Sequence, residues 1–133
     1  MENLKNNQFN HFKIHTQFSI CEGAVLIDEL KEHCNKNKIR SVGISDTLNL
    51  SGVLEFSENI SKSGTQPIIG TQIQVKFNNY IGLVPLIAKN ELGYKRLIEL
   101  SSKSYLENNS LDEPHCLLQD LIIETNNIIV LSG

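Results

Sequence analysis

The stretch FNHFKIHTQFSICEGA, residues 9–24, decides how the rest of the chain is interpreted. Its first part alternates polar and apolar residues like a β-strand over 10–14, and it places His11, Lys13 and His15 within five residues. Its second part is a polar Ser/Glu/Gly turn that leads into a helix. Because the sites of α/β proteins lie at the carboxyl ends of strands, we expect a functional site at this turn.

The segments that follow alternate between helical and strand patterns. Helices are predicted over 25–36, 53–62, 91–104 and 117–125, and strands over 40–45, 66–75, 80–88 and 127–131. Asn78-Asn79 predicts a two-residue hairpin turn, and Asn90 is a predicted helix cap. The pattern is typical of an α/β fold. The last strand is expected to be buried and parallel, which would require a covering helix beyond residue 133.

Composition limits the function of the chain. Its 133 residues make at most one domain, and a net charge of −3 argues against gripping nucleic-acid phosphates unaided. The chain lacks an apolar run long enough to span a membrane, and its first residues lack a secretory pattern, so we expect a cytoplasmic protein. Neither a phosphate-binding glycine loop nor a nucleophile motif is present. The three cysteines, Cys21, Cys34 and Cys116, are expected to be incidental thiols.

Five blocks of the sequence stand in an order that resembles one family. They are the opening stretch through Gly23, SVGISDTLNLSGVLEF (41–56), QPIIGTQIQV (66–75), LIAKNELGYKRLIELSS (86–102) and NIIVLSG (127–133). Together they resemble the PHP (polymerase and histidinol phosphatase) domain that begins the alpha subunit of bacterial replicative DNA polymerase III. The resemblance implies that 9–133 is the amino-terminal portion of a distorted (β/α)7 barrel, incomplete at its C-terminal end. Residues 1–8 are expected to be disordered or frayed.

Active PHP domains hold metal ions with His and carboxylate side chains and hydrolyse phosphoesters. The resemblance places their ligand positions at seven residues of this chain, of which His15, Glu22 and Asp46 keep a ligand type. The other four are Lys13, Thr47, Gln72 and Leu83. A lysine is protonated at neutral pH and repels a cation. We therefore expect a vestigial site that holds no metal, in which Lys13 provides the counter-charge for Glu22 or Asp46.

Single residues among these also have simpler interpretations. His15 is either a hydrogen-bonded structural residue or a ligand, and Asp46 is either a site residue or the cap of the turn that follows it. His115 is predicted to be a solvated loop residue. Gly64 and Gly70 are predicted to be turn residues.

The resemblance implies a structural module that docks the rest of the polymerase alpha subunit and, in some bacteria, the proofreading exonuclease subunit. The parent protein would be a DNA-directed DNA polymerase, whose palm, Mg²⁺ and DNA contacts lie outside this chain. The fragment alone is expected to be inactive, to bind no cofactor and to meet no membrane. Two alternatives remain. One is a metal-dependent PHP phosphoesterase or 3′–5′ exonuclease, and the other is a small unrelated α/β binding protein.

Overall fold

The computed structural model describes residues 9–109 and 111–132, so the prediction for residues 1–8 lies outside the described residues. The chain forms an α/β fold, as predicted. In order, the elements are α1 (Ile27–Asn37), β1 (Ser41–Thr47), α2 (Val53–Lys62), β2 (Gln66–Phe77), β3 (Tyr80–Ala88), α3 (Glu91–Leu106), β4 (Cys116–Leu117), α4 (Leu118–Ile122) and β5 (Ile128–Val130). Among the residues described, no helix has both the length and the apolar character needed to cross a membrane.

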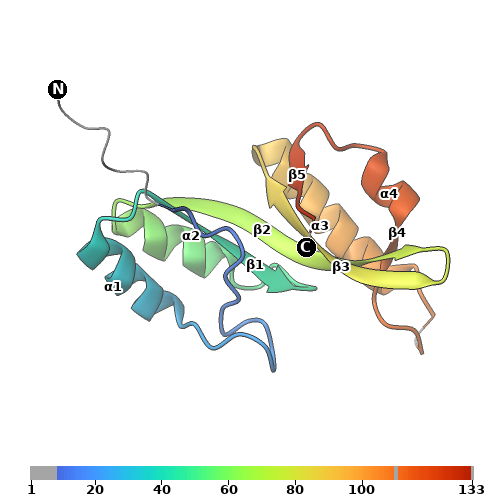
Figure 1. Cartoon of the computed structure of the whole chain (residues 1–133), viewed down its shortest axis with the longest axis horizontal. Helices are drawn as coiled ribbons and strands as arrows, with labels where there is room; N and C mark the ends of the chain where they lie inside the picture. The colour runs from blue at the N-terminus through green and yellow to red at the C-terminus, as the bar shows by residue number, and fades with distance from the viewer. Residues whose placement is uncertain (1–8, 110, 133) are drawn as a thin grey trace.

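The strands form one mixed sheet in the order β1-β2-β3-β5, with β4 paired to β2. β1 and β2 are parallel, whereas β3 is antiparallel to both β2 and β5. Asn78 makes the predicted hairpin turn between β2 and β3, with φ at 55°. β2 is the long strand that runs through both halves of the molecule, from α1 and α2 at one end to α3 and α4 at the other (Figure 1).

The predicted strand over 10–14 is only partly formed. This segment lies beside β1 and makes one isolated bridge, between Ile14 and Ile44. Gly43 N donates to His11 O over 2.7 Å, and Ser45 N donates to Ile14 O over 2.8 Å. From His11 to Ile14 the segment advances by three residues, while β1 advances by two, from Gly43 to Ser45. The segment therefore carries one extra residue, which interrupts the ladder as a bulge does.

Two further predictions are wrong, one on the direction of the last strand and one on the place of Gly70. β5 is antiparallel and not parallel, and its residues Ile129 and Val130 are each 42% exposed. Antiparallel neighbours do not need the crossover helix that joins two parallel strands, so the pairing of β5 gives no support to that expectation. Gly70 lies inside β2 and not in a turn. A Cβ there would come within 2.9 Å of backbone oxygens on both neighbouring strands, so the close strand spacing requires glycine.

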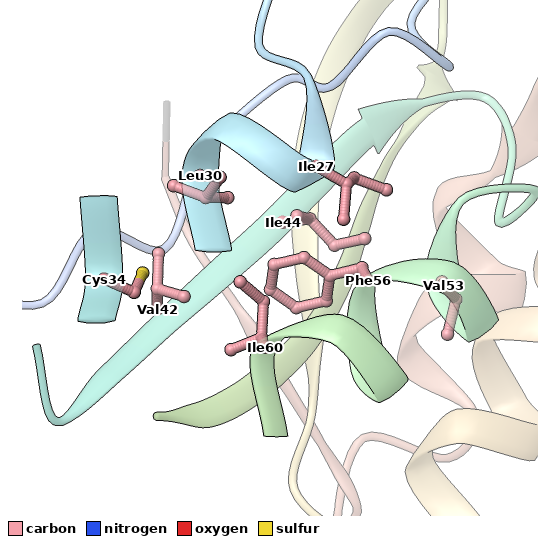
Figure 2. Packing of buried hydrophobic residues seen from close by; sticks show 8 residues of the cluster. All are labelled: Ile27, Leu30, Cys34, Val42, Ile44, Val53, Phe56 and Ile60. Carbon is pink, nitrogen blue, oxygen red and sulfur yellow. The ribbon is translucent and has the colours of Figure 1, made fainter. Parts of the chain in front are cut away.

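The apolar core lies on one face of the sheet in two clusters. The first joins α1, β1 and α2 around the fully buried Phe56, which Figure 2 shows against Ile44 and Ile60. The second joins α3 to Ile73 of β2 and Leu86 of β3. Because side chains alternate along a strand, the same pattern turns Ser45, Gln72 and Gln74 to the opposite face.

The helix ends have partners that link them to neighbouring segments. Asn90 Oδ1 accepts from Gly93 N over 2.9 Å and caps α3, as predicted. α1 has no capping side chain at its own N-cap residue; instead Gln17 Oε1 accepts from Ile27 N over 3.1 Å. Lys38 ends α1 in the left-handed conformation, with φ at 52°. The turn after residue 15 is therefore tied directly to α1.

Asp120 fastens α4 to α3. Its carboxylate lies 2.8 Å from Lys103 Nζ and accepts from Leu117 N over 3.0 Å, and its backbone oxygen accepts from Arg96 over 2.6 Å. Burial alone would raise the pKa of the Asp120 carboxyl. The hydrogen bonds from Lys103 and from the Leu117 backbone outweigh burial and hold that pKa below its usual value.

Asp120→Asn is expected to destabilise the fold at neutral pH by less than about 1 kcal/mol, because Asp120 pairs with a partly exposed lysine. A carboxyl whose pKa is lower in the folded state stabilises the fold above its unfolded pKa, and this stabilisation is lost as pH falls through the folded value. The difference between wild type and variant should thus begin to shrink near pH 4, the unfolded value, and disappear only below the lowered folded pKa of Asp120. Urea unfolding at several pH values measures it, with Glu58→Gln on the exposed side of α2 as the control.

Candidate functional site

The turn over residues 16–23 is fixed to the end of β1 by one buried carboxylate. Asp46 is 1% exposed, and its Oδ1 accepts from Thr16 N over 2.6 Å and from Ser19 Oγ over 2.7 Å. Its Oδ2 accepts from the Thr16 hydroxyl over 2.7 Å. The Asp46 side chain thus does not cap the turn that follows it. Three uncharged donors satisfy it, and all three come from the opening stretch.

A second carboxylate, that of Glu22, lies near this turn and is partly exposed, with 41% of its side-chain surface accessible. It accepts hydrogen bonds from Thr47 Oγ1 and from Gln72 Nε2, the latter over 3.3 Å, and His15 Nε2 lies 3.6 Å from its Oε1. Gln72 Nε2 also donates to Thr47 Oγ1 over 2.7 Å. The two carboxylate groups are connected through Ser19, whose hydroxyl oxygen accepts from Thr47 N over 3.1 Å.

The structure therefore brings five of the seven predicted positions together at the carboxyl end of β1 and the middle of β2, where Thr47 pairs with Gln72. They are His15, Glu22, Asp46, Thr47 and Gln72.

Lys13 and Leu83 do not join this group. Lys13 is exposed and forms no ion pair with either carboxylate within the described residues, so the prediction that it provides their counter-charge is wrong. The hydroxyl and amide donors take that part, because they reach Asp46 from the turn itself. Leu83 is 44% exposed and lies opposite Gln74, whereas Pro85 is the residue opposite Gln72.

Three smaller predictions have mixed outcomes. His15 contacts Glu22, but its Nδ1 is buried without a partner among the described atoms. His115 is buried rather than solvated, and its Nδ1 lies 2.8 Å from Glu113 O. Gly64 is a turn residue as predicted, with φ at 77°.

Thr16 and Ser19 are the functional residues that the sequence did not reveal. Both are fully or almost fully buried and donate to Asp46. The only signal in the sequence is a pair of hydroxyl residues three apart in a turn, which is a common pattern and suggests no partner. Their role depends on a contact across about thirty residues of chain, which local patterns do not contain.

The donor set fits a metal cluster poorly. Metal ligands must offer lone pairs, but both Asp46 oxygens accept from N–H or O–H groups, and Gln72 turns its N–H₂ toward Glu22. Within the described part of the chain, no three His, Cys, Asp or Glu side chains converge as ligands for one ion. Ser45 Oγ and Gln72 Oε1 are buried here without partners, and neither carries a charge.

Comparison with known proteins gives these positions a context. The family model of the PHP domain matches residues 11–133. DNA polymerase III subunit alpha of Caulobacter vibrioides is 32% identical over 100% of this chain, and that of Haemophilus influenzae is 35% identical over 95%. The corresponding Rickettsia felis protein is 34% identical over 93%. This chain spans only 10% to 12% of the length of these relatives.

Two solved structures share the fold. One is a Bifidobacterium adolescentis protein described as a metal-dependent phosphoesterase, with a TM-score of 0.56 and 19% identity. The other is an amidohydrolase from Chromobacterium violaceum with bound sulfate and no metal, with a TM-score of 0.57 and 13% identity. Each match covers 71% of this chain and 32% of the other. The fold and the family model agree, and the chain belongs to the PHP domain family.

Proposed function

We propose that this chain is the PHP module of a DNA polymerase III alpha subunit and that it acts there as a metal-free structural module. The main observation is that the two carboxylates at predicted ligand positions, Asp46 and Glu22, already accept hydrogen bonds from hydroxyl, amide and backbone N–H groups. A carboxylate that already accepts three hydrogen bonds gains little from a cation and would have to give them up to bind one. The same contacts hold the opening turn against β1 and β2.

The curated relatives support the assignment to the polymerase. Three of them match nearly the whole chain and carry the name of the alpha subunit. In this proposal the chain is the amino-terminal portion of a distorted (β/α)7 barrel in a cytoplasmic protein. Its partners are the rest of the alpha subunit and, where one exists, the proofreading exonuclease subunit. DNA synthesis, with its Mg²⁺, takes place in the palm of the parent protein, and this segment alone is inactive.

The coding sequence that follows residue 133 in the source genome tests the assignment to the polymerase. We expect an open reading frame that continues the barrel and then encodes a large polymerase chain. A stop codon directly after residue 133 would contradict the proposal.

Metal content tests the structural role of the site. After incubation with Zn²⁺ and Mn²⁺ and removal of free ions, the wild-type chain is expected to retain less than about 0.1 ion per molecule, because its donors are already hydrogen-bonded. The double variant Thr47→His, Gln72→Glu restores two of the family's ligand types within the group that the structure brings together, and it should retain more. Elemental analysis measures both, with Lys62→His at the exposed end of α2 as the matched control.

Two or more tightly bound metal ions in the wild-type chain would contradict the structural role. That result would favour the alternative, a PHP phosphoesterase or 3′–5′ exonuclease. The observation behind this alternative is the fold shared with the protein described as a metal-dependent phosphoesterase. Release of p-nitrophenol from p-nitrophenyl phosphate would then be the activity to measure.

A further inference from the structure

Two residues beside the candidate site have a backbone conformation that their side chains disfavour. Four non-glycine residues of the described chain have positive φ. Lys38 ends α1 and Asn78 makes the hairpin turn, and both are common places for this conformation. The other two are Cys21, with φ at 64°, and Leu48, with φ at 59°. A bulky side chain such as that of leucine makes this conformation costly, so the surrounding contacts must hold it.

These two residues lie on either side of one hydrogen bond of the site. Cys21 precedes Glu22, and Leu48 follows Thr47. The Thr47 hydroxyl donates to the Glu22 carboxylate. Because residues in costly conformations persist only where neighbouring contacts fix them, the structure holds a particular geometry at this contact.

The bend at Leu48 lets both of its neighbours hold the opening turn. Thr47 N donates to Ser19 Oγ over 3.1 Å. The Asn49 amide donates to Phe18 O over 3.0 Å and also back to Thr47 O over 3.0 Å, which requires the chain to bend between residues 47 and 49. The residues before and after Leu48 thus both contact the opening turn.

Two partners outside the opening turn hold the backbone of Leu48. Its N–H donates to Gln72 O over 2.8 Å, and its carbonyl accepts from the Tyr105 hydroxyl over 3.0 Å. Gln72 lies inside β2, whereas Tyr105 lies in the last turn of α3 and is 53% exposed. The contact from Tyr105 is therefore the one that can be lost without disturbing the sheet.

We propose that Thr47, Leu48 and Asn49 form a clasp through which Tyr105, at the end of α3, sets how firmly the opening turn is closed against β1. Tyr105 is a positioning residue, because it acts on the turn through Leu48. With its hydroxyl in place, Leu48 stays left-handed and its neighbours keep their contacts with the turn. Without the hydroxyl, Leu48 leaves this conformation more often and the turn opens with it. The coupling lies within the described residues and holds whichever larger protein contains the chain.

Amide hydrogen exchange of the 133-residue chain tests the proposal at the amides of Glu22 and Gly23, which are hydrogen-bonded within the turn. Tyr105→Phe should make both exchange about threefold faster, because it removes one hydrogen bond from the closed state. The Lys89 amide, which is hydrogen-bonded beside β5, is the internal reference and should keep its wild-type rate. Tyr80→Phe changes a tyrosine that is 79% exposed, so this matched control should leave all three rates unchanged.

Substitutions at Leu48 test the clasp independently of Tyr105. Leu48→Gly removes the side chain that disfavours the left-handed conformation, so the two turn amides should exchange about threefold more slowly. Leu48→Val places a branch next to the backbone and should make them exchange about fivefold faster. Leu54, exposed on α2, is the matched position. There the order is reversed, because glycine weakens a helix more than valine does.

The double variant Leu48→Gly, Tyr105→Phe should return to within about twofold of the wild-type rates, because the two effects oppose each other. If Leu48→Val does not fold, the glycine and phenylalanine variants still decide the question. Faster exchange of the turn in Leu48→Gly overturns the proposal, since the left-handed conformation would then cost nothing. Wild-type rates in Tyr105→Phe also overturn it, as does an equal change at Lys89, which would show global rather than local opening.

Discussion

Replacing Asp46 with alanine is expected to lower the free energy of unfolding by about 4 kcal/mol, since it leaves three buried donors without an acceptor. These donors are the backbone N–H and hydroxyl of Thr16 and the hydroxyl of Ser19. The turn that they hold also carries Gln17, which accepts from the first turn of α1. Losing the carboxylate therefore loosens the contact between the opening stretch, β1 and α1. Urea unfolding followed by circular dichroism measures the change.

Asp46→Asn separates the effect of charge from the effect of shape. Its amide oxygen can still accept from Thr16 N, but its NH₂ group replaces an acceptor, so we expect about half the loss. Glu55→Ala is the control, because this exposed carboxylate only accepts a long hydrogen bond from Gln17. An Asp46→Ala variant as stable as the wild type would show that the buried network is not what holds the turn.

Gly23→Ala is expected to destabilise the fold by about 3 kcal/mol, because the new Cβ has no room. It would lie 2.0 Å from Thr16 O and 2.8 Å from the backbone of His15. Both neighbours are main-chain atoms of the same turn, which cannot move aside as the end of a flexible side chain can. The turn must open, and Glu22 must then separate from Thr47 and Gln72. Thermal unfolding measures the loss of stability, and the NMR signals of the Gln72 side-chain amide report the loss of its contact.

Gly82→Ala is the matched control for this substitution. The same methyl group there meets open space, so stability should stay within about 0.5 kcal/mol of the wild type. Equal stability of the two alanine variants would contradict the crowding argument.

Local patterns in the sequence predicted the elements well, because helix periodicity, caps and tight turns act over short distances. The hairpin at Asn78-Asn79 and the cap at Asn90 follow from the residues themselves. Two features depend on distant partners and could not be predicted this way. An apolar run such as that of β5 does not reveal whether its neighbour is parallel or antiparallel. The extra residue between His11 and Ile14 is visible only against β1.

The candidate site shows the same division. The family resemblance grouped Glu22, Asp46, Thr47 and Gln72, and the structure brings them together because Asp46 and Thr47 end β1 and Gln72 is the β2 residue paired with Thr47. Lys13 is predicted from the sequence to be the counter-charge of Glu22 or Asp46. In the structure the neutral hydroxyls of Thr16 and Ser19 donate to Asp46 instead. Serine and threonine are so common in turns that the sequence alone does not predict this contact. A sequence shows which residues are charged, but it does not show which hydroxyl groups donate hydrogen bonds to a buried carboxylate in place of a charged partner.

The length of β2 has a consequence for folding. The strand supplies Ile69 to the cluster around Phe56, and Ile73 and Val75 to the cluster around α3. Neither half of the molecule can lose this strand without exposing its own apolar side chains. Because both clusters share this strand, we expect them to unfold as one cooperative unit within the residues that the structure describes.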